Sequence, residues 1–174
     1  GLGDVYKRQA DLPAAQAEDR IDALLTQAVA DRLESEVPLG AMLSGGLDSS
    51  LVVAIATKLL GRRVHTFSVG FDHSAFDESP HARAVAEHCG TEHHVHRVGA
   101  HDARLAIDEI LDHMGEPYAF PSAIAAYCMY RLARQYVTVV LTGDGSDEIF
   151  CGYRRYQVFD RLPAVDAGDA ARVD

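Results

Sequence analysis

Hydrophobic and polar positions along the chain follow two alternating patterns, one helical and one extended. Apolar side chains that recur every three or four residues predict helices at residues 14–37, 48–60, 77–89, 102–114 and 121–135, with a further helix after Asp147. Short apolar runs rich in β-branched and aromatic residues predict strands at residues 39–43, 64–71, 93–98 and 137–141. This alternation predicts an α/β fold with a doubly wound, mainly parallel sheet and helices on both faces.

The same patterns predict where elements end and which side chains face the core. Pro38 is expected to end the first helix, and Gly61 and Gly90 stand where a glycine commonly follows a helix. The inward-facing residues expected in the helix at 102–114 are Leu105, Ile107, Ile110 and Leu111. Residues 14–159 are expected to form one domain core, preceded by a disordered or non-native segment at 1–13 and followed by a frayed or truncated tail at 160–174.

Composition narrows the class of protein. The chain has 174 residues, of which 48% are hydrophobic, and a formal net charge of −10. A chain of this size can bury a real core, and no apolar run reaches the roughly 20 residues that span a bilayer. The acidic balance argues against nucleic-acid binding, which needs a basic face. Three widely spaced cysteines and the lack of a signal-peptide pattern favour a reduced, cytoplasmic setting.

Two Gly- and hydroxyl-rich loops follow predicted strands and open predicted helices. The first, SGGLDSS, covers residues 44–50, and the second, TGDGSDE, covers residues 142–148. In doubly wound sheets, ligands bind outside the carboxyl ends of the strands. Asp48 and Asp147 therefore stand at the mouths of parallel strands, where two carboxylates that converge on one cleft need a cation between them.

The residue types of the first loop suit an anion. Gly45 and Gly46 allow a tight turn, and N–H groups at the following helix start can cradle phosphate. The hydroxyls of Ser44, Ser49 and Ser50 add donors, and Asp48 is interpreted as a magnesium ligand. The loop has no lysine, which excludes the GxxxxGK[ST] loop, and its adjacent glycines do not fit GxGxxG. The simpler alternative is a Gly-Ser turn with Asp48 as the N-cap of the helix.

Three further sequence features are weaker evidence for function. The histidine-rich stretch at 88–96 fits no common zinc-ligand spacing, and strand alternation predicts that His93 and His94 point to opposite faces. Arg154 and Arg155 suit either phosphate binding or a solvated helix face. Neither loop fits the G-x-S-x-G pattern of a serine hydrolase.

SGGLDSS resembles the pyrophosphate loop of the N-type ATP pyrophosphatases (PP-loop enzymes). Within them, TGDGSDEIFCGYRRY at 142–156 is similar to the asparagine-synthetase domain, as are CGTEHH at 89–94 and the segment at 116–127. The resemblance implies an adenine nucleotide alpha hydrolase-like fold, with ATP and Mg²⁺ as cofactors. The implied nucleotide-binding residues are Leu43, Ser44, Gly45, Gly46, Leu47, Asp48, Ser49, Ser50, Val69, Thr142 and Gly143, with Leu43 and Val69 each ending a strand. The implied catalytic residues are Asp48, Asp144 and Asp147, and the metal ligands are Asp48 and Asp147.

The chain departs from the family pattern at several positions. Thr142 keeps the hydroxyl of a usual serine, whereas Ser146 and Cys151 replace glycines, so a mild change in the turn is expected there. Phe120 replaces an aspartate, which puts local substrate contacts in doubt. Asp144 stands where related β-lactam synthetases have tyrosine, and an acid there favours amide synthesis from ammonia.

The resemblance implies an ATP-dependent carbon–nitrogen ligase that adenylates the side-chain carboxylate of aspartate for attack by ammonia. Ammonia would come from glutamine through a glutaminase domain that this chain lacks, so the chain is expected to be truncated and to lack full activity. No nucleic acid or membrane partner is expected, and a homodimer is left open. The alternatives are an adenylating enzyme for another carboxylate, a nucleotide or a tRNA base, and a non-catalytic ATP-binding module.

Overall fold

The computed structural model describes residues 12–74, 76–116, 122–153 and 156. The chain divides into two compact units, Gly1–Thr142 and Gly143–Asp174, and each is described by itself. The predictions made for Phe120, for Arg154 and Arg155, for the tail at 160–174 and for most of the segment at 1–13 lie outside the described residues.

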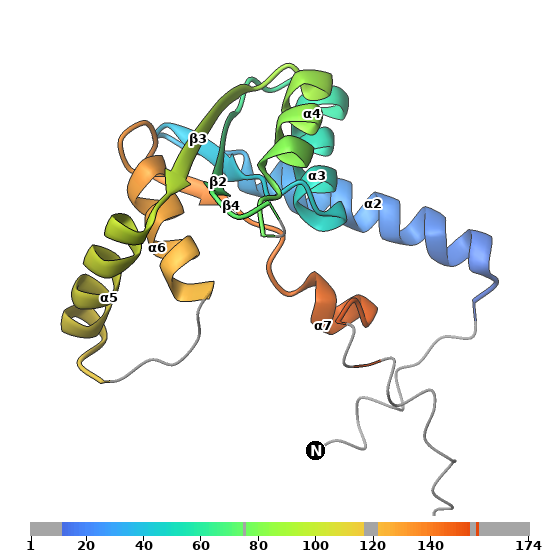
Figure 1. Ribbon diagram of the computed structural model, residues 1–174. Coiled ribbons are helices and arrows are strands. Elements are labelled where there is room, and N and C mark those ends of the chain that lie inside the picture. Colours follow the sequence, from blue (N-terminus) through green and yellow to red (C-terminus); the bar gives the residue numbers. More distant parts are fainter. Residues whose placement is uncertain (1–11, 75, 117–121, 154–155, 157–174) are drawn as a thin grey trace, which may run out of the picture. The chain divides into compact units, whose positions relative to one another are not determined.

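The first unit contains a four-stranded parallel sheet (Figure 1). Its strands are β1 (Leu39–Met42), β2 (His65–Phe71), β3 (Glu92–Val98) and β4 (Val139–Leu141). They lie in the order β3-β2-β1-β4, and every pair is parallel. The chain therefore builds outward from β1 to β3 and then returns to the other side of β1. The reversal of strand order between β1 and β4 is a topological switch point, the usual place for a ligand in such sheets.

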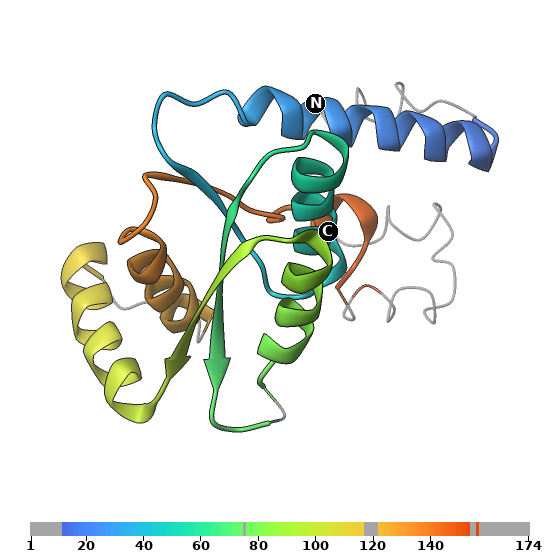
Figure 2. The same cartoon turned by 90° about the horizontal axis from the view of Figure 1, so that it is seen from above.

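Helices cover both faces of this sheet, as the sequence predicted. The described helices are α2 (Ala14–Arg32), α3 (Leu47–Ala54), the π-helix η1 (Ile55–Leu59), α4 (Ser79–Cys89), α5 (Ala100–Met114), α6 (Ser122–Ala133) and, in the second unit, α7 (Ser146–Phe150). Figures 1 and 2 show α3 and α4 on one side of the strands and α5 and α6 on the other. The α/β, doubly wound prediction is confirmed.

The side chains of β1 alternate between the two faces of the sheet, and both faces are buried. Ala41 and Leu43, both 0% exposed, pack in the cluster that β1 forms with α2, α3, η1 and α4. Met42 points the other way and packs with Phe67 and Val137 beside α6. Because successive strand residues point to opposite faces, a run that is apolar throughout belongs in a sheet covered on both sides.

The first helix is shorter than predicted, because it ends at Arg32 rather than near residue 37. Its end is bonded from elsewhere in the chain: Arg62 donates to the carbonyl oxygen of Leu33 at 3.2 Å. Beyond it, Val37 N–H donates to Ser35 Oγ at 3.2 Å in a local turn. Pro38 disfavours helical backbone at the residue before it, so the chain is already extended there.

The helix predicted at 48–60 also differs in its last turn. It is α-helical to Ala54 and then widens into η1, where Leu60 N–H donates to Ile55 O, five residues back, at 3.1 Å. Gly61 follows with a φ of 63° and Gly90 follows α4 with a φ of 67°. Both glycines therefore have the left-handed backbone expected after a helix end.

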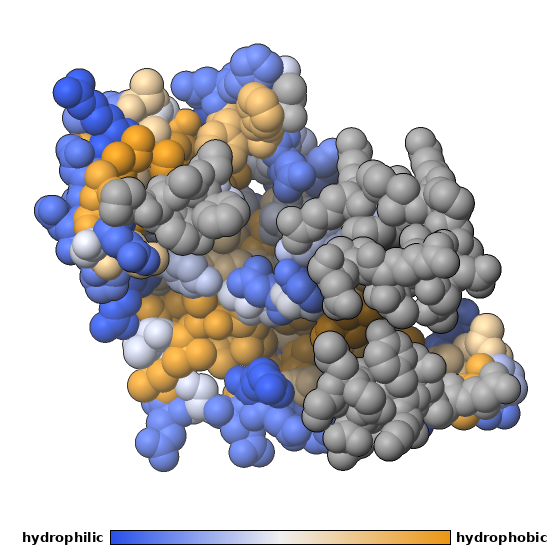
Figure 3. Space-filling view, turned by 90° about the horizontal axis from the view of Figure 1, so that it is seen from below, coloured by the Kyte–Doolittle hydropathy of each residue, from blue (hydrophilic) through white to orange (hydrophobic). Residues whose placement is uncertain are grey.

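The predicted inward face of α5 is wrong for three residues. Leu105, Ile107 and Leu111 are 42%, 44% and 40% exposed, whereas the buried contacts come from Ala106 and, in part, Ile110. Ala106 packs against Val98 and Cys128, with Ala103 and Ile110 beside it, so small residues make much of the buried contact of α5. Figure 3 shows apolar areas lying between hydrophilic side chains on one face of the molecule.

Candidate functional site

The switch point brings the first loop beside the start of the second. Ala41 of β1 pairs with Leu141 of β4, so the two strands end next to each other within the first unit. Leu43 continues the ladder past β1 by donating its N–H to Phe67 O at 2.8 Å. Ser44 and Thr142 therefore leave the sheet at adjacent positions on its carboxyl edge.

Gly45 is the tightest position of the first loop. Its φ of +88° lies in the left-handed region, and a Cβ placed there would lie 2.5 Å from Ala82 N and 2.7 Å from His81 Cβ of α4. Gly46 differs, because its φ is −69° and a Cβ would meet only Ser44 Oγ, at 3.3 Å. The first glycine is thus needed by the fold, whereas the second leaves room above the backbone.

The serine hydroxyls of the loop brace its own backbone. Ser49 is buried, and its Oγ accepts the Ser44 N–H at 3.2 Å and lies 3.0 Å from Ser44 Oγ. Ser50 Oγ donates to Gly46 O at 2.6 Å. Ser44 Oγ also accepts the Gly46 N–H at 3.2 Å. These bonds hold the glycine turn in one shape.

The loop leads into the N-terminus of α3 without a side-chain cap. Gly46 is the N-cap, and Asp48 lies in the first turn, so the alternative in which Asp48 itself is the N-cap is wrong. The N–H groups of the first helical turn have no partner within the helix and carry the positive end of its dipole. Leu47 is 81% exposed and Asp48 is half-buried beside these donors. The arrangement can bind an anion.

Leu43 and Val69, which the resemblance implies as nucleotide-binding residues, have side chains packed in the core. The side chain of Leu43 is fully buried in the cluster beside α3 and α4, which leaves its main chain at the loop. Val69 does not end a strand, because β2 continues to Phe71, and its side chain packs with Val98 toward α5 and α6. At Gly70, a Cβ would lie 3.3 Å from Asp77 Oδ1 and 3.2 Å from Ser79 Oγ.

Asp77 fixes the passage from β2 to α4. Its Oδ1 accepts the N–H groups of Ser79 at 3.1 Å and Phe71 at 3.4 Å. The hydrogen bond from the Ser79 side chain, with these backbone bonds and the nearby Arg97 charge, holds the pKa of Asp77 below its usual value. Asp77 thus bonds the first N–H of α4 from two residues before it, whereas the N-cap position itself is Glu78.

The second loop and α7 belong to the second unit. Gly145, with a φ of +92°, precedes α7, and Ser146 Oγ donates to Gly143 O at 2.9 Å. Asp147 is half-buried, and its carboxylate lies where a Cβ on Gly152 would stand. Asp144 is exposed. The joint role of Asp48 and Asp147 in holding magnesium stays a prediction.

Cys151 has a backbone conformation that favours glycine. Its φ is 57°, and it is the one described non-glycine residue with a positive φ. The left-handed backbone carries the strain cost of a Cβ in that conformation, and the mild change expected in this turn relative to the family stays a prediction.

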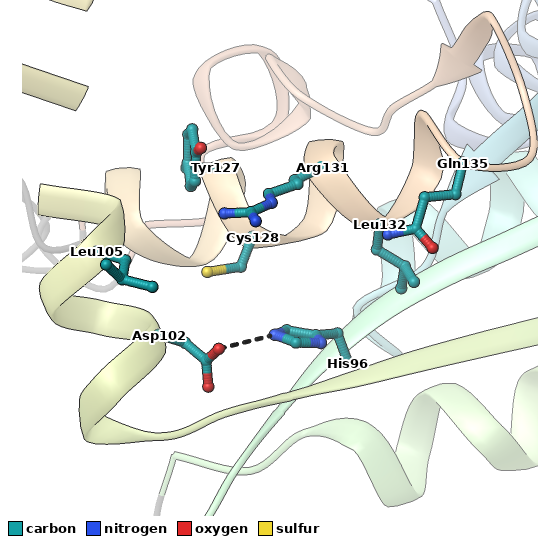
Figure 4. A pocket seen from close by; sticks show the side chains of 8 residues that line it. All are labelled: His96, Asp102, Leu105, Tyr127, Cys128, Arg131, Leu132 and Gln135. Carbon is teal, nitrogen blue, oxygen red and sulfur yellow. Dashed lines mark ion pairs between the residues drawn. The ribbon is translucent and has the colours of Figure 1, made fainter. Parts of the chain in front are cut away.

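A cavity of about 180 Å³ lies between β3, α5 and α6 (Figure 4). Its lining includes none of the predicted site residues; it consists of His96, Asp102, Leu105, Tyr127, Cys128, Arg131, Leu132 and Gln135. His96 Nε2 lies 3.7 Å from Asp102 Oδ1. Burial raises the pKa of the Cys128 thiol, which keeps it protonated. Sequence spacing could not find this cavity, because its residues come from three elements.

The histidines of β3 point to opposite faces, as predicted. His93 lies under α4, where Nδ1 is 2.9 Å from Thr66 Oγ1 and Nε2 is 3.3 Å from Ser68 Oγ. Burial lowers its pKa, so the neutral ring bonds two hydroxyls. His94 faces the other side and stacks on Tyr136, with ring centroids 3.9 Å apart.

The sequence of this chain matches that of known proteins over most of its length. The profile of the family described as asparagine synthase matches residues 20–172. The chain belongs to the asparagine synthase family. It is similar to a putative asparagine synthetase [glutamine-hydrolyzing] 2 of Methanocaldococcus jannaschii, at 42% identity over 131 residues, covering 75% of this chain and 25% of that protein. Asparagine synthetase [glutamine-hydrolyzing] 1 of Bacillus subtilis is 34% identical over 162 residues, covering 87% and 26%.

Solved structures agree on the fold of this family member. An NH3-dependent NAD synthetase from Campylobacter jejuni superposes with a TM-score of 0.53 at 17% identity, covering 78% of this chain and 60% of that chain. An NMN synthetase from Francisella tularensis gives a TM-score of 0.50 at 19% identity, covering 82% and 59%. These likenesses support the adenine nucleotide alpha hydrolase-like fold that the sequence predicts for this chain.

The chain spans about a quarter of the length of the curated relatives it matches. Among the helices of the described residues, none combines the length and the apolar character needed to cross a bilayer.

Proposed function

We propose that this chain carries the ATP-dependent, amide-forming step of asparagine synthesis. The loop from Ser44 to Ser50 binds the phosphates of ATP, and the substrate activated there is the side-chain carboxylate of aspartate. The observation that carries the proposal is the unit formed by β1, the Gly45 turn and the uncapped N-terminus of α3, at the switch point of a parallel sheet. Membership in the asparagine synthase family supports the choice of reaction.

The chemistry proceeds in two steps. An oxygen of the aspartate carboxylate attacks the α-phosphorus of ATP, the bond between the α- and β-phosphates breaks, and pyrophosphate leaves with the electron pair. Ammonia then attacks the acyl carbon, loses a proton, and displaces AMP to leave the amide. The N–H groups at the start of α3 hold the negative charge that develops on the leaving pyrophosphate.

The donor set of the first loop fits magnesium. A half-buried carboxylate from Asp48, next to N–H groups that attract phosphate, suits a cation that prefers carboxylate and phosphate oxygens. Asp48 and Asp147 would hold the ion, which supplies charge neutralisation at the phosphates when bound. Thr142 and Gly143, next to the end of β4, would contact the nucleotide, and Asp144 would favour ammonia as the attacking group.

Two measurements on this chain test the proposal. Calorimetric titration with ATP and Mg²⁺ should show binding that weakens at least about tenfold in Asp48→Asn, since an acid in that loop is useful only with a cation between it and phosphate. Asp112→Asn, an exposed acid on α5, is the matched control and should bind like the parent. ATP–pyrophosphate exchange should depend on aspartate and be lost in Asp48→Asn.

The other outcomes separate the alternatives. Exchange that depends on another carboxylate, a nucleotide or a tRNA base, but not on aspartate, would assign a different substrate to the same loop. Binding of ATP without exchange under any condition would favour a non-catalytic ATP-binding module. Equal ATP binding by Asp48→Asn and the parent, with both variants folded, would refute the magnesium role of Asp48.

A further inference from the structure

A group of potential metal ligands lies at the amino edge of the sheet, away from the Ser44–Ser50 loop. It consists of His65 at the start of β2 and of Glu92 and His94 on β3. The parallel register places His65 opposite Glu92 and Phe67 opposite His94. Side chains at alternate positions of one strand share a face, so Glu92 and His94 both face His65.

The distances within this group suit a small cation. His65 Nδ1 lies 3.1 Å from His94 Nε2. The Glu92 carboxylate reaches both rings, with Oε2 3.7 Å from His65 Nδ1 and Oε1 3.8 Å from His94 Nε2. Ligand atoms around a tetrahedral zinc ion, with bonds of about 2.0–2.1 Å, lie about 3.3 Å apart. The two ring nitrogens therefore already lie at about this separation, and rotation of the exposed Glu92 side chain would bring one carboxylate oxygen to the same ion.

The histidines are held in place by aromatic packing. The ring of His94 stacks on Tyr136 and Phe67, with centroids 3.9 Å and 5.3 Å away, and the His65 ring stacks on that of His94 at 5.4 Å. The side chain of His94 is 15% exposed, whereas that of Glu92 is 69% exposed. Two rings with restricted rotation and one mobile carboxylate give a partly formed site with an open side for solvent.

We propose that His65, Glu92 and His94 form a binding site for one divalent transition-metal ion of the zinc type. Imidazole nitrogen and carboxylate oxygen together favour Zn²⁺ and its neighbours over Mg²⁺ or Ca²⁺, which prefer oxygen alone. Without metal, the facing nitrogens of His65 and His94 share one hydrogen bond through a single ring proton. With metal, both nitrogens donate lone pairs and Glu92 completes the protein ligands.

The site joins β3, an edge strand, to β2. A metal that binds the folded chain and not the unfolded one raises stability by mass action. The sequence alone could not indicate this site, because the stretch at 88–96 holds only two of the three ligands. The third, His65, lies 27 residues before Glu92 and is placed opposite it by the register of the two strands.

The test uses the full chain, stripped with a chelator and then titrated with Zn²⁺ alone. Competition with a chromogenic chelator should show one Zn²⁺ per chain, and the thermal midpoint should rise as Zn²⁺ is added. Histidine ¹⁵N spectra should show that Zn²⁺ shifts His65 Nδ1 and His94 Nε2. Glu92→Gln and His65→Gln should each weaken binding about tenfold or more, while His88→Gln, at an exposed histidine of α4, should not.

These variants distinguish a metal site from a cluster of ion pairs that binds no metal. Glu92 is exposed, so Glu92→Gln should fold, and circular dichroism checks this. If the chain takes up no Zn²⁺, or if Glu92→Gln and His65→Gln bind it as tightly as His88→Gln, the proposal is overturned. Zn²⁺-induced shifts confined to other histidines would also overturn it. None of these outcomes bears on ATP binding at the Ser44–Ser50 loop.

Discussion

Replacement of Gly45 by alanine should destabilise the protein far more than the same change at Gly46. At Gly45 the new Cβ would require a φ near +88° and would lie 2.5 Å from Ala82 N, a main-chain atom that cannot rotate away. At Gly46 the φ of −69° suits alanine, and the nearest atom is Ser44 Oγ at 3.3 Å. The two substitutions add the same methyl group at adjacent positions of one loop.

The expected magnitudes follow from these contacts. Left-handed backbone costs an alanine about 1–2 kcal/mol, and forcing a methyl group into a packed interior costs about 1–3 kcal/mol more. Gly45→Ala should therefore lower the free energy of unfolding by about 2–5 kcal/mol. Gly46→Ala should lose about 1 kcal/mol or less, since it only replaces one N-cap residue by a poorer one.

Urea unfolding followed by circular dichroism measures the free energy of unfolding of both variants, and titration with ATP measures their affinity for the nucleotide. Gly46→Ala should remain folded yet bind ATP more weakly, because its methyl group occupies the open space above the backbone where phosphate would approach. If Gly45→Ala is as stable as Gly46→Ala, the contact with α4 does not constrain the loop, and the reasoning from Gly45 fails.

Three further predictions concern single groups. Cys151→Gly should slow amide hydrogen exchange in α7, because it removes about 1 kcal/mol of left-handed backbone strain. Gly145→Ala, at a φ of +92°, should add such strain and make exchange in α7 faster. Faster exchange in Cys151→Gly than in Gly145→Ala would show that left-handed strain does not limit α7. Ser49→Ala should lower both thermal stability and ATP affinity because the Ser44 N–H loses its acceptor, and an unchanged affinity would show that this brace is dispensable. The Gly99 N–H and nearby histidines lower the pKa of Asp102 in the folded chain. The stability that this carboxylate contributes is therefore present above its usual pKa of about 3.9 and is lost as the pH falls through the lower folded value. Asp102→Asn should make the free energy of unfolding less dependent on pH in that acidic range, and an unchanged dependence would contradict this.

The sequence predicts the strands and the strand-following loops well, because both depend on local pattern. The run from Leu39 to Leu43 is apolar throughout and is followed at once by Ser44 and two glycines, so strand, turn and helix start are all encoded within a dozen residues. Helix ends were less accurate where distant residues decide them. The end of α2 at Arg32 depends partly on a bond from Arg62 to Leu33, which periodicity does not detect.

Properties that depend on contacts between different helices and strands could not be predicted from the sequence pattern. The exposure of Leu105 does not follow from periodicity, because the buried contact of α5 is made by Ala106 with Val98 and Cys128 of other elements. The grouping of His65 with His94 depends on the register of two strands. The left-handed backbone at Cys151 likewise appears only in the dihedral angles, since the sequence pattern does not indicate a positive φ at a cysteine.

The pairing of β1 with β4 has a consequence for the order in which the chain folds. β1 pairs with β4 through residues as far apart as Ala41 and Leu141, whereas β1 and β2 are joined by a short crossover. Closing a longer loop costs more chain entropy and slows contact formation. During synthesis, β1, β2 and β3 can assemble while β4 is still inside the ribosome. The Ser44–Ser50 loop would thus acquire its neighbouring strand β4 last, and the switch point beside the loop would form only when the sheet is complete.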